Sequence, residues 1–159
     1  MNENSTQAEV AQTSIGQGET LVTPAHMAML AAAIANKGVL MKPYMIDKVE
    51  NSNGTIVSQA EKTECKKLMT KSQAKQLQEY MSAVCDYGTA RIFQVLLTKY
   101  MVRQVQQSLI RITTSTLGLW GYAKKGKKQL AIAVVYENIK DGTISAKECA
   151  KEYFDDYFK

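Results

Sequence analysis

The chain has 159 residues, 45% of them apolar, which suits one globular domain with a buried core and excludes a disordered chain. No apolar run reaches the roughly 20 residues of a membrane span, and the start "MNENSTQAEV" lacks the basic and apolar regions of a secretory signal. The formal net charge of +5 leaves open an anionic partner. As written, the sequence predicts a single domain over residues 1–159 that stays in the cytoplasm.

The first predicted elements are a polar lead-in and a helix. Residues 1–22 are polar and end in a loop with two glycines, "SIGQGETLV". Thr23 can accept a hydrogen bond from the free N–H groups of a following helix, and Pro24 suits its first position. Asn36 and Gly38 provide the stop signal. This helix is apolar nearly all round, which predicts that it is deeply buried.

A hairpin and a second helix follow. Two short β-prone runs flank Asn53 and Gly54, a strong signal for a hairpin turn. From about Lys71 to Asp86 the apolar residues recur at helical spacing and form one stripe. That stripe comprises Ala74, Leu77, Tyr80, Met81, Val84 and Cys85.

The C-terminal part predicts a hairpin and a closing helix. The stretch "LWGYAKKGKKQLAIAVVYEN" has a solvated basic turn, Lys124 to Lys128, and a second arm, Gln129 to Tyr136, as apolar as a central strand. Ser145 can cap the last helix. Its apolar face comprises Cys149, Ala150, Tyr153, Phe154, Tyr157 and Phe158. Together these elements predict an α+β fold: a mostly antiparallel sheet with helices packed against it.

Between these regular parts lies an unusual segment, Gln94 to Trp120, "QVLLTKYMVRQVQQSLIRITTSTLGLW". It contains no Asp, Glu or Pro, and no Gly before Gly118. It also holds Lys99, Arg103 and Arg111 with no acid to balance them, so the net charge is weak evidence for an anionic partner.

The order of the flanking pieces resembles the C-terminal part of a class B penicillin-binding protein transpeptidase domain. "SIGQGETLVTPAHMAMLAAAIANKG" is similar to the signature that opens a buried helix in that family, and "PYMIDKVENSNGTIV" to the hairpin after it. "MSAVCDYGTARIF" resembles a helix end with its G-T-A, and "WGYA" and "IAVVYEN" resemble the last two strands. The positions that match the family motifs are Gly16, Gln17, Gly18, Thr23, Pro24, Gly88, Thr89, Ala90, Trp120, Gly121 and Tyr122.

The resemblance implies a fold like that of penicillin-binding proteins and serine β-lactamases, and a serine D,D-transpeptidase of peptidoglycan synthesis. Such enzymes acylate a serine with the D-Ala-D-Ala end of a stem peptide or with a β-lactam, using S-x-x-K, S-x-N and K-[ST]-G. The K-[ST]-G strand lies between the G-T-A helix end and the W-F-x-G-Y-A strand. Here the segment 94–120 fills that interval without K-[ST]-G, and we find no S-x-N in context.

A shift of reading frame accounts for this gap. Synonymous codons for Met101 to Ser108 can hide G-K-T-G-T-A-E in the shifted frame, and those for Ser115 to Gly121 can hide H-S-W-F-M-G. The whole segment can hide G-S-S-Y-K-V-Y-G-K-T-G-T-A-E-F-D-K-D-N-Y-I-H-S-W-F-M-G, which runs directly into the visible Tyr122-Ala123. One base lost near Phe93 and one gained near Gly121 would suffice. The alternative is a natural, divergent, β-prone segment.

Other candidate sites are weaker. The tetrapeptide Ser72 to Lys75 fits S-x-x-K but lies downstream of the loop that the family's nucleophile precedes, so we expect Ser72 to be a helix cap. Gly16 to Gly18 lacks the lysine of a phosphate-binding loop. His26 is the only histidine, and Cys65, Cys85 and Cys149 stand far apart, which predicts buried cysteines and no metal site. We expect no cofactor.

The sequence therefore predicts an inactive, frame-damaged fragment whose intact relatives are membrane-anchored and extracytoplasmic. Loss of half the domain would expose core surface and favour aggregation. Two alternatives stay open. One is a small basic module that binds an anionic partner, for which RNA is an example. Our main prediction includes no nucleic-acid partner. The other is a non-catalytic protein associated with the cell wall.

Overall fold

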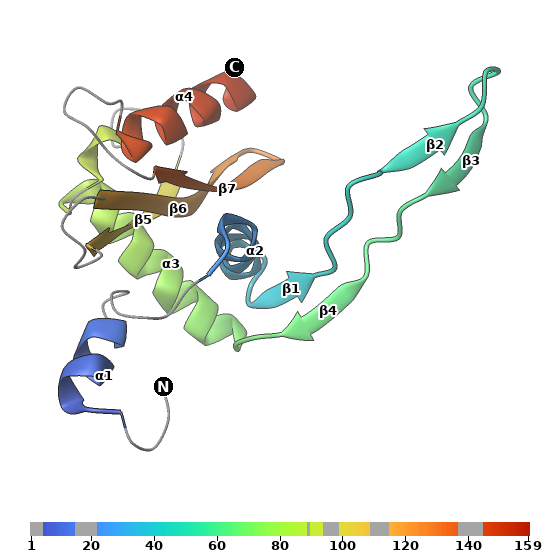
Figure 1. The fold of residues 1–159 in the computed structure, drawn as a ribbon. Helices are drawn as coiled ribbons and strands as arrows, with labels where there is room; N and C mark the ends of the chain where they lie inside the picture. Colours follow the sequence, from blue (N-terminus) through green and yellow to red (C-terminus); the bar gives the residue numbers. More distant parts are fainter. Residues whose placement is uncertain (1–4, 15–21, 89, 94–98, 109–114, 137–144) are drawn as a thin grey trace.

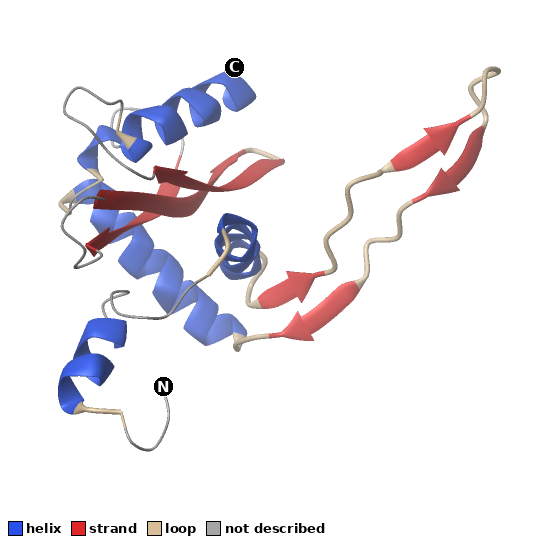
Figure 2. Ribbon diagram, viewed as in Figure 1, coloured by secondary structure: helices blue, strands red, loops and turns tan. Residues whose placement is uncertain are grey.

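The computed structural model describes residues 5–14, 22–88, 90–93, 99–108, 115–136 and 145–159. Its body is an antiparallel three-stranded sheet, in the order β5-β6-β7, packed between helices (Figures 1 and 2). A long two-stranded arm projects from this body beside α2 (Figure 1). The α+β class predicted from the sequence is confirmed.

The sheet separates two apolar layers because side chains alternate along β6, Ser115–Lys125. Leu119 and Ala123 face a cluster with Phe93 and Phe154, whereas Tyr122 packs with Ile34 and Met81 on the other face. The first layer is covered by α4, Ala146–Phe158, and the second by α2 and α3. Helices on both faces thus give the short sheet its core.

Helix α2, Pro24–Ala35, begins and ends as predicted. Thr23 Oγ1 accepts a hydrogen bond from the His26 N–H at 3.2 Å, Pro24 is the first helical residue, and Asn36 is the C-cap. The deep burial predicted for α2 is wrong. Only Ala31, Ala33 and Ile34 are buried, and Ala32 is exposed, because the sheet and α3 cover one side of the helix within the described residues.

The arm consists of two ladders in line. Strand β1, Val39–Met41, pairs with β4, Glu64–Lys67, and β2, Lys48–Glu50, pairs with β3, Ile56–Gln59. The predicted turn at its tip is confirmed: Asn51 Oδ1 accepts from the N–H groups of Asn53 and Thr55, and Gly54 has φ +79°. The β1–β4 ladder was not predicted, because the charged stretch "ECKK" gives no strand signal.

Helix α3, Lys71–Asp86, carries the predicted stripe with one exception. Ala74, Met81 and Cys85 are buried, and Leu77 and Val84 pack against the two clusters. Tyr80 is 59% exposed, and its hydroxyl accepts a hydrogen bond from Gln76 Nε2 at 2.9 Å. Tyr80 lies at the edge of the stripe, where a phenol can keep its polar end in water.

The cap of α3 is Thr70, not Ser72 as predicted. Thr70 Oγ1 accepts from the Gln73 N–H at 3.2 Å, and Gln73 Oε1 accepts from the Thr70 N–H at 2.9 Å, which completes a capping box. Ser72 is already helical and exposed. Ser72 lies two residues after Thr70, so both residues have the type and approximate place expected of a cap.

We therefore expect Thr70→Ala to lower the free energy of unfolding by about 1 kcal/mol, since it leaves a helix N–H without its acceptor. Ser72→Ala should change it by less than about 0.5 kcal/mol, as for other exposed substitutions. Urea unfolding followed by circular dichroism measures both. Equal losses would contradict the assignment of the cap.

Two further short helical segments lie in the described part of the chain. Helix α1, Gln7–Ser14, lies in the stretch predicted to be a polar lead-in, and Thr6 with Glu9 caps it. A single 3-10 turn, η1, Arg91–Phe93, connects α3 to the segment before β5. It places Phe93 in the core.

The predicted C-terminal hairpin forms from β6 and β7, Lys128–Tyr136, around Gly126 at φ +59°. The unusual segment supplies β5, Lys99–Ser108, and the first residues of β6, whereas residues 94–98 and 109–114 lie outside the described parts. The central position expected for Gln129 to Tyr136 is wrong: among the described strands β7 lies at the edge of the sheet.

Helix α4 closes the core, and Ser145 caps it as predicted, in a capping box with Glu148. The hydrogen bonds from the Ser145 backbone and hydroxyl hold the pKa of Glu148 below its usual range. Ala150, Phe154 and Phe158 are buried as expected. The placement of two tyrosines on the apolar face is wrong, since Tyr153 and Tyr157 are exposed at 63% and 45%.

The cysteines differ from one another in burial. Cys85 is buried between α3 and the sheet, Cys149 is half-buried, and Cys65 is exposed on the arm. The prediction of three buried cysteines is therefore wrong for Cys65, because the two-stranded arm has no layer to cover it in the described part of the chain.

Candidate active-site edge

Strand β5 occupies the interval in which the sequence analysis found no K-[ST]-G. It pairs with β6 in an unbroken antiparallel register, from Lys99 opposite Lys124 to Ser108 opposite Ser115. In the shifted frame, K-T-G would span the codons of residues 102–105, and these backbone positions pair with Gly121 to Gly118. The triplet would thus lie in the middle of β5, at the edge of the described sheet.

Trp120, Gly121 and Tyr122 belong to the part of β6 that pairs with the middle of β5. Tyr122 is buried against Ile34 and Met81, with Trp120 packed beside them, and burial raises the pKa of the Tyr122 phenol. The indole Nε1 of Trp120 is buried and has no hydrogen-bond partner within the described residues. These residues pair with β5 through their backbone, and none of their side chains carries a charge.

Gly88 and Ala90, the two described residues of the G-T-A match, lie between the end of α3 and η1. The Gly88 N–H donates to Ala83 O at 3.2 Å, and the Ala90 N–H donates to Val84 O at 3.1 Å. A Cβ at Gly88 would lie 2.8 Å from the Val84 Cα, and Ala90 is fully buried. This tight packing explains the small residues at both positions.

The other motif positions divide into two groups. Thr23 and Pro24 start α2, as described above. Gly16, Gln17, Gly18 and Thr89 lie outside the described residues. The structure thus places Ala90 in one cluster with Leu119 and Ala123 of β6, and it pairs the W-G-Y stretch of β6 with the middle of β5.

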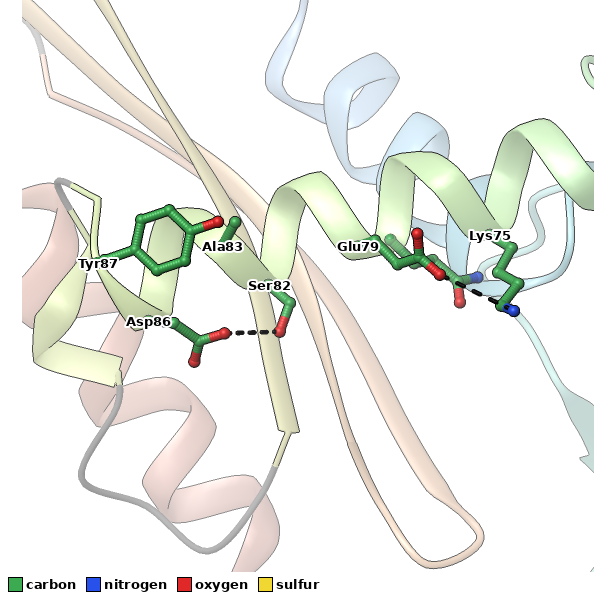
Figure 3. Close-up of a pocket in the computed structure, with 7 residues that line it drawn as sticks. Lys75, Glu79, Ser82, Ala83, Asp86 and Tyr87 are labelled. Carbon is green, nitrogen blue, oxygen red and sulfur yellow. Dashed lines mark hydrogen bonds and ion pairs between the residues drawn. The ribbon is translucent and has the colours of Figure 1, made fainter.

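A shallow hollow of about 330 Å³ lies along the exposed face of α3 (Figure 3). Its polar groups pair with each other: Lys75 Nζ lies 3.9 Å from Glu79 Oε1, and Ser82 Oγ donates to Asp86 Oδ2 at 3.3 Å. Sequence reasoning did not find this hollow, since its residues are ordinary polar positions of an amphipathic helix. A carboxylate beside a serine on an open helix surface does not make an activated nucleophile.

The S-x-x-K match on α3 also lacks the required geometry. The Lys75 side chain is 78% exposed and points along the helix to Glu79, away from any apolar layer of the described residues (Figure 3). A lysine that removes a proton from serine must be neutral and hydrogen-bonded to it, which needs burial or a neighbouring cation. Ser72 and Lys75 therefore have the spacing of the motif without its chemistry.

The basic turn between β6 and β7 has a structural use. Lys125 Nζ donates to Phe158 O at 2.7 Å, at the C-terminus of α4, and Lys128 Nζ lies 5.9 Å from the centre of the Tyr157 ring. A cation at a helix C-terminus satisfies a free carbonyl and opposes the negative end of the helix dipole. Half of the turn's lysines are thus engaged within the fold, which weakens the case for an anionic partner.

Two further searches cover only the described residues. No helix there is long and apolar enough to span a bilayer. No group of three or more His, Cys, Asp or Glu side chains in that part of the chain is placed to hold a metal ion.

An antiparallel sheet between helices, with a strand that follows a G-T-A turn, is the architecture expected of a transpeptidase domain. The chain belongs to the penicillin-binding protein family, since the family model described as the penicillin binding protein transpeptidase domain matches residues 1–155.

Two curated relatives have similar sequences. The chain is 29% identical over 162 residues to the peptidoglycan D,D-transpeptidase MrdA of Acinetobacter baumannii, which covers 92% of this chain and 24% of MrdA. It is 35% identical over 51 residues to the peptidoglycan D,D-transpeptidase PbpA of Mycolicibacterium smegmatis, covering 32% of this chain and 10% of PbpA. The chain thus spans about a quarter of MrdA.

Solved structures share the fold. The imipenem acyl-enzyme complex of penicillin-binding protein A from M. tuberculosis superimposes with a TM-score of 0.83 at 20% identity, covering 99% of this chain and 36% of that one. The D,D-transpeptidase domain of a peptidoglycan glycosyltransferase from Eggerthella lenta gives 0.71 at 25% identity, covering 86% and 33%. The chain spans about a third of each of these structures.

Proposed function

We propose that these 159 residues are the C-terminal part of a class B D,D-transpeptidase of peptidoglycan synthesis, with residues 94–120 translated out of frame. On this proposal, the chain by itself forms no acyl-enzyme. One observation carries this proposal. Along the chain, β5 lies between the G-T-A match and the W-G-Y-A strand, where the family has K-[ST]-G, yet its sequence contains no K-[ST]-G.

Formation of β5 depends on backbone atoms, whereas catalysis at this edge depends on particular side chains. A β-ladder is held by backbone N–H and C=O groups, so β5 can pair with β6 whatever its side chains are. The residues of 99–108 are also β-prone and contain neither Pro nor Gly. The reaction, in contrast, needs a lysine and a hydroxyl of the K-[ST]-G triplet at fixed places along this edge.

Acyl transfer also needs a nucleophilic serine activated by a nearby base. The S-x-x-K match is an exposed stretch of α3 with Lys75 paired to Glu79, and S-x-N in context is absent from the sequence. We therefore assign binding of stem peptide and β-lactam, and a membrane-anchored, extracytoplasmic location, to a complete parent protein. For the 159-residue chain we propose none of these.

The test is intact-protein mass spectrometry after incubation with imipenem. We expect no mass increase in the 159-residue chain, while penicillin-binding protein A of M. tuberculosis, solved as an imipenem acyl-enzyme, provides the positive control. Ser72→Ala, treated alongside, separates the S-x-x-K match from other serines. An adduct on any serine of the chain would show that it is active and would overturn the proposal.

A further inference from the structure

The asparagines in the described part of the chain, Asn36, Asn51 and Asn53, differ in what holds their side chains. Asn36 Nδ2 donates to Val39 O at 3.0 Å. Asn51 Oδ1 accepts from the N–H groups of Asn53 and Thr55 at 3.0 and 2.9 Å. The side-chain amide of Asn53 is exposed and has no hydrogen-bond partner among the described residues.

The residue after each asparagine controls how closely a backbone nitrogen can approach the side-chain amide. Gly54 follows Asn53, whereas Lys37 and Ser52, which follow the other two, each have a Cβ beside that nitrogen. A Cβ built on Gly54 would meet nothing within 4 Å, so the space around this residue is open. The absence of a Cβ permits a close approach of backbone and amide.

One interaction opposes this approach. The Gly54 N–H donates to Asn51 O at 3.0 Å, and this hydrogen bond must open before the nitrogen can reach the amide. The bond lies at the tip of the arm, far from the body (Figure 1). All residues from 42 to 59 are exposed, and the β2–β3 ladder contains a register shift. A two-stranded ribbon of this kind is marginally stable, so local opening of its tip costs little free energy.

We propose that Asn53 is a site of spontaneous deamidation, for which the chain supplies the nucleophile and water is the only other reactant. The Gly54 nitrogen loses its proton to hydroxide and forms a bond to the Asn53 Cγ. The bond from Cγ to the side-chain nitrogen then breaks, and ammonia leaves with a proton from water, which regenerates hydroxide. Water opens the resulting succinimide at either carbonyl carbon and yields aspartate or isoaspartate at position 53.

Either product changes the tip of the arm. Both carry a carboxylate where the amide was neutral, and isoaspartate also adds a methylene group to the main chain inside the turn. This insertion displaces the N–H groups of residue 53 and Thr55 from Asn51 Oδ1, which holds the turn. Pairing of β2 with β3 therefore weakens as isoaspartate accumulates.

The test is incubation of the 159-residue chain in mildly alkaline buffer, followed by tryptic digestion and mass spectrometry with fragmentation that distinguishes aspartate from isoaspartate. Peptide 49–62 contains both Asn51 and Asn53, so one spectrum compares them. Asn53 should convert at least about ten times faster than Asn51 or Asn36, since their amides must first lose hydrogen bonds. Asn53→Gln keeps an amide but would have to close a larger ring, so it should abolish the product at this position.

Ser52→Gly provides the matched control, because it places a glycine after Asn51 as well. In the folded variant Asn51 should stay at least about tenfold slower than Asn53, and in urea, where its hydrogen bonds are lost, the two rates should be equal. Equal rates in the folded variant would refute the role of the free amide. If the variant distorts the turn, the wild type decides: conversion of Asn53 no faster than that of Asn36 would refute the site.

This inference goes beyond the proposed function and stands apart from it. A β-lactam adduct on a serine would leave the reaction at Asn53 untouched, and a stable Asn53 would leave the β-lactam result untouched.

Discussion

Phe154→Ala should lower the free energy of unfolding by about 3–5 kcal/mol, a large fraction of the stability of a small domain. Phe154 is fully buried at the centre of the layer between α4 and the sheet. Its ring meets Phe93 edge-on at 6.2 Å between centroids and stacks with Phe158 at 6.4 Å. Removal of the ring leaves a cavity and forfeits both ring contacts.

The control for this change is Tyr153→Ala on the same helix, where the side chain is 63% exposed. We expect a loss below about 1 kcal/mol there, since little apolar surface returns to water. Thermal and urea unfolding of both variants, followed by circular dichroism, measure the difference. Comparable losses would mean that α4 does not pack on the sheet through the face that contains Phe154.

Gly38→Ala is the second change with a large expected effect, about 3 kcal/mol of destabilisation. Gly38 has φ +91°, a conformation that costs an L-residue about 1–2 kcal/mol. A Cβ there would also lie 2.4 Å from the Met69 carbonyl oxygen, which must then move. The carbonyl of Gly38 accepts the Leu68 N–H at 2.9 Å, so this movement would disturb the junction of α2, the arm and α3.

Gly54→Ala isolates the two contributions. Gly54 has φ +79° at the tip of the arm, and a Cβ there would meet nothing within 4 Å. It should cost about 1–2 kcal/mol for the backbone conformation alone. Urea midpoints of both variants give the comparison. If Gly38→Ala costs no more than Gly54→Ala, the close approach of Met69 is not a constraint on the fold.

The predictions that succeeded rest on local chemistry. Thr23 and Pro24, Ser145, and the Asn53-Gly54 turn each specify their backbone through neighbours a few residues away, which a sequence displays directly. The family resemblance and the α+β class followed from the order of such signals along the chain. The turn that contains Gly88 and Ala90 lies where the G-T-A match predicts it, after α3.

The predictions that failed depend on what covers a surface. The burial of α2, the place of β7 in the sheet and the exposure of Cys65 are decided by layers that pattern alone does not reveal. For Tyr80, Tyr153 and Tyr157 the helical spacing was right, but a tyrosine at the border of an apolar face can turn its hydroxyl to water. The sequence predicts Ser72 as the cap because serine is a common capping residue, but Thr70, two residues earlier, makes the capping box.

The central claim is that residues 94–120 are a shifted translation of the active-site edge, and the nucleotide sequence across codons 90–125 tests it most directly. Two independent genomic reads that span this region exclude a sequencing slip. We predict that a single-base shift within it yields K-T-G at codons 102–105, followed by W-F-x-G before Tyr122. If neither shifted frame encodes K-[ST]-G there, the segment is a genuine strand of a divergent family member and the frameshift explanation fails.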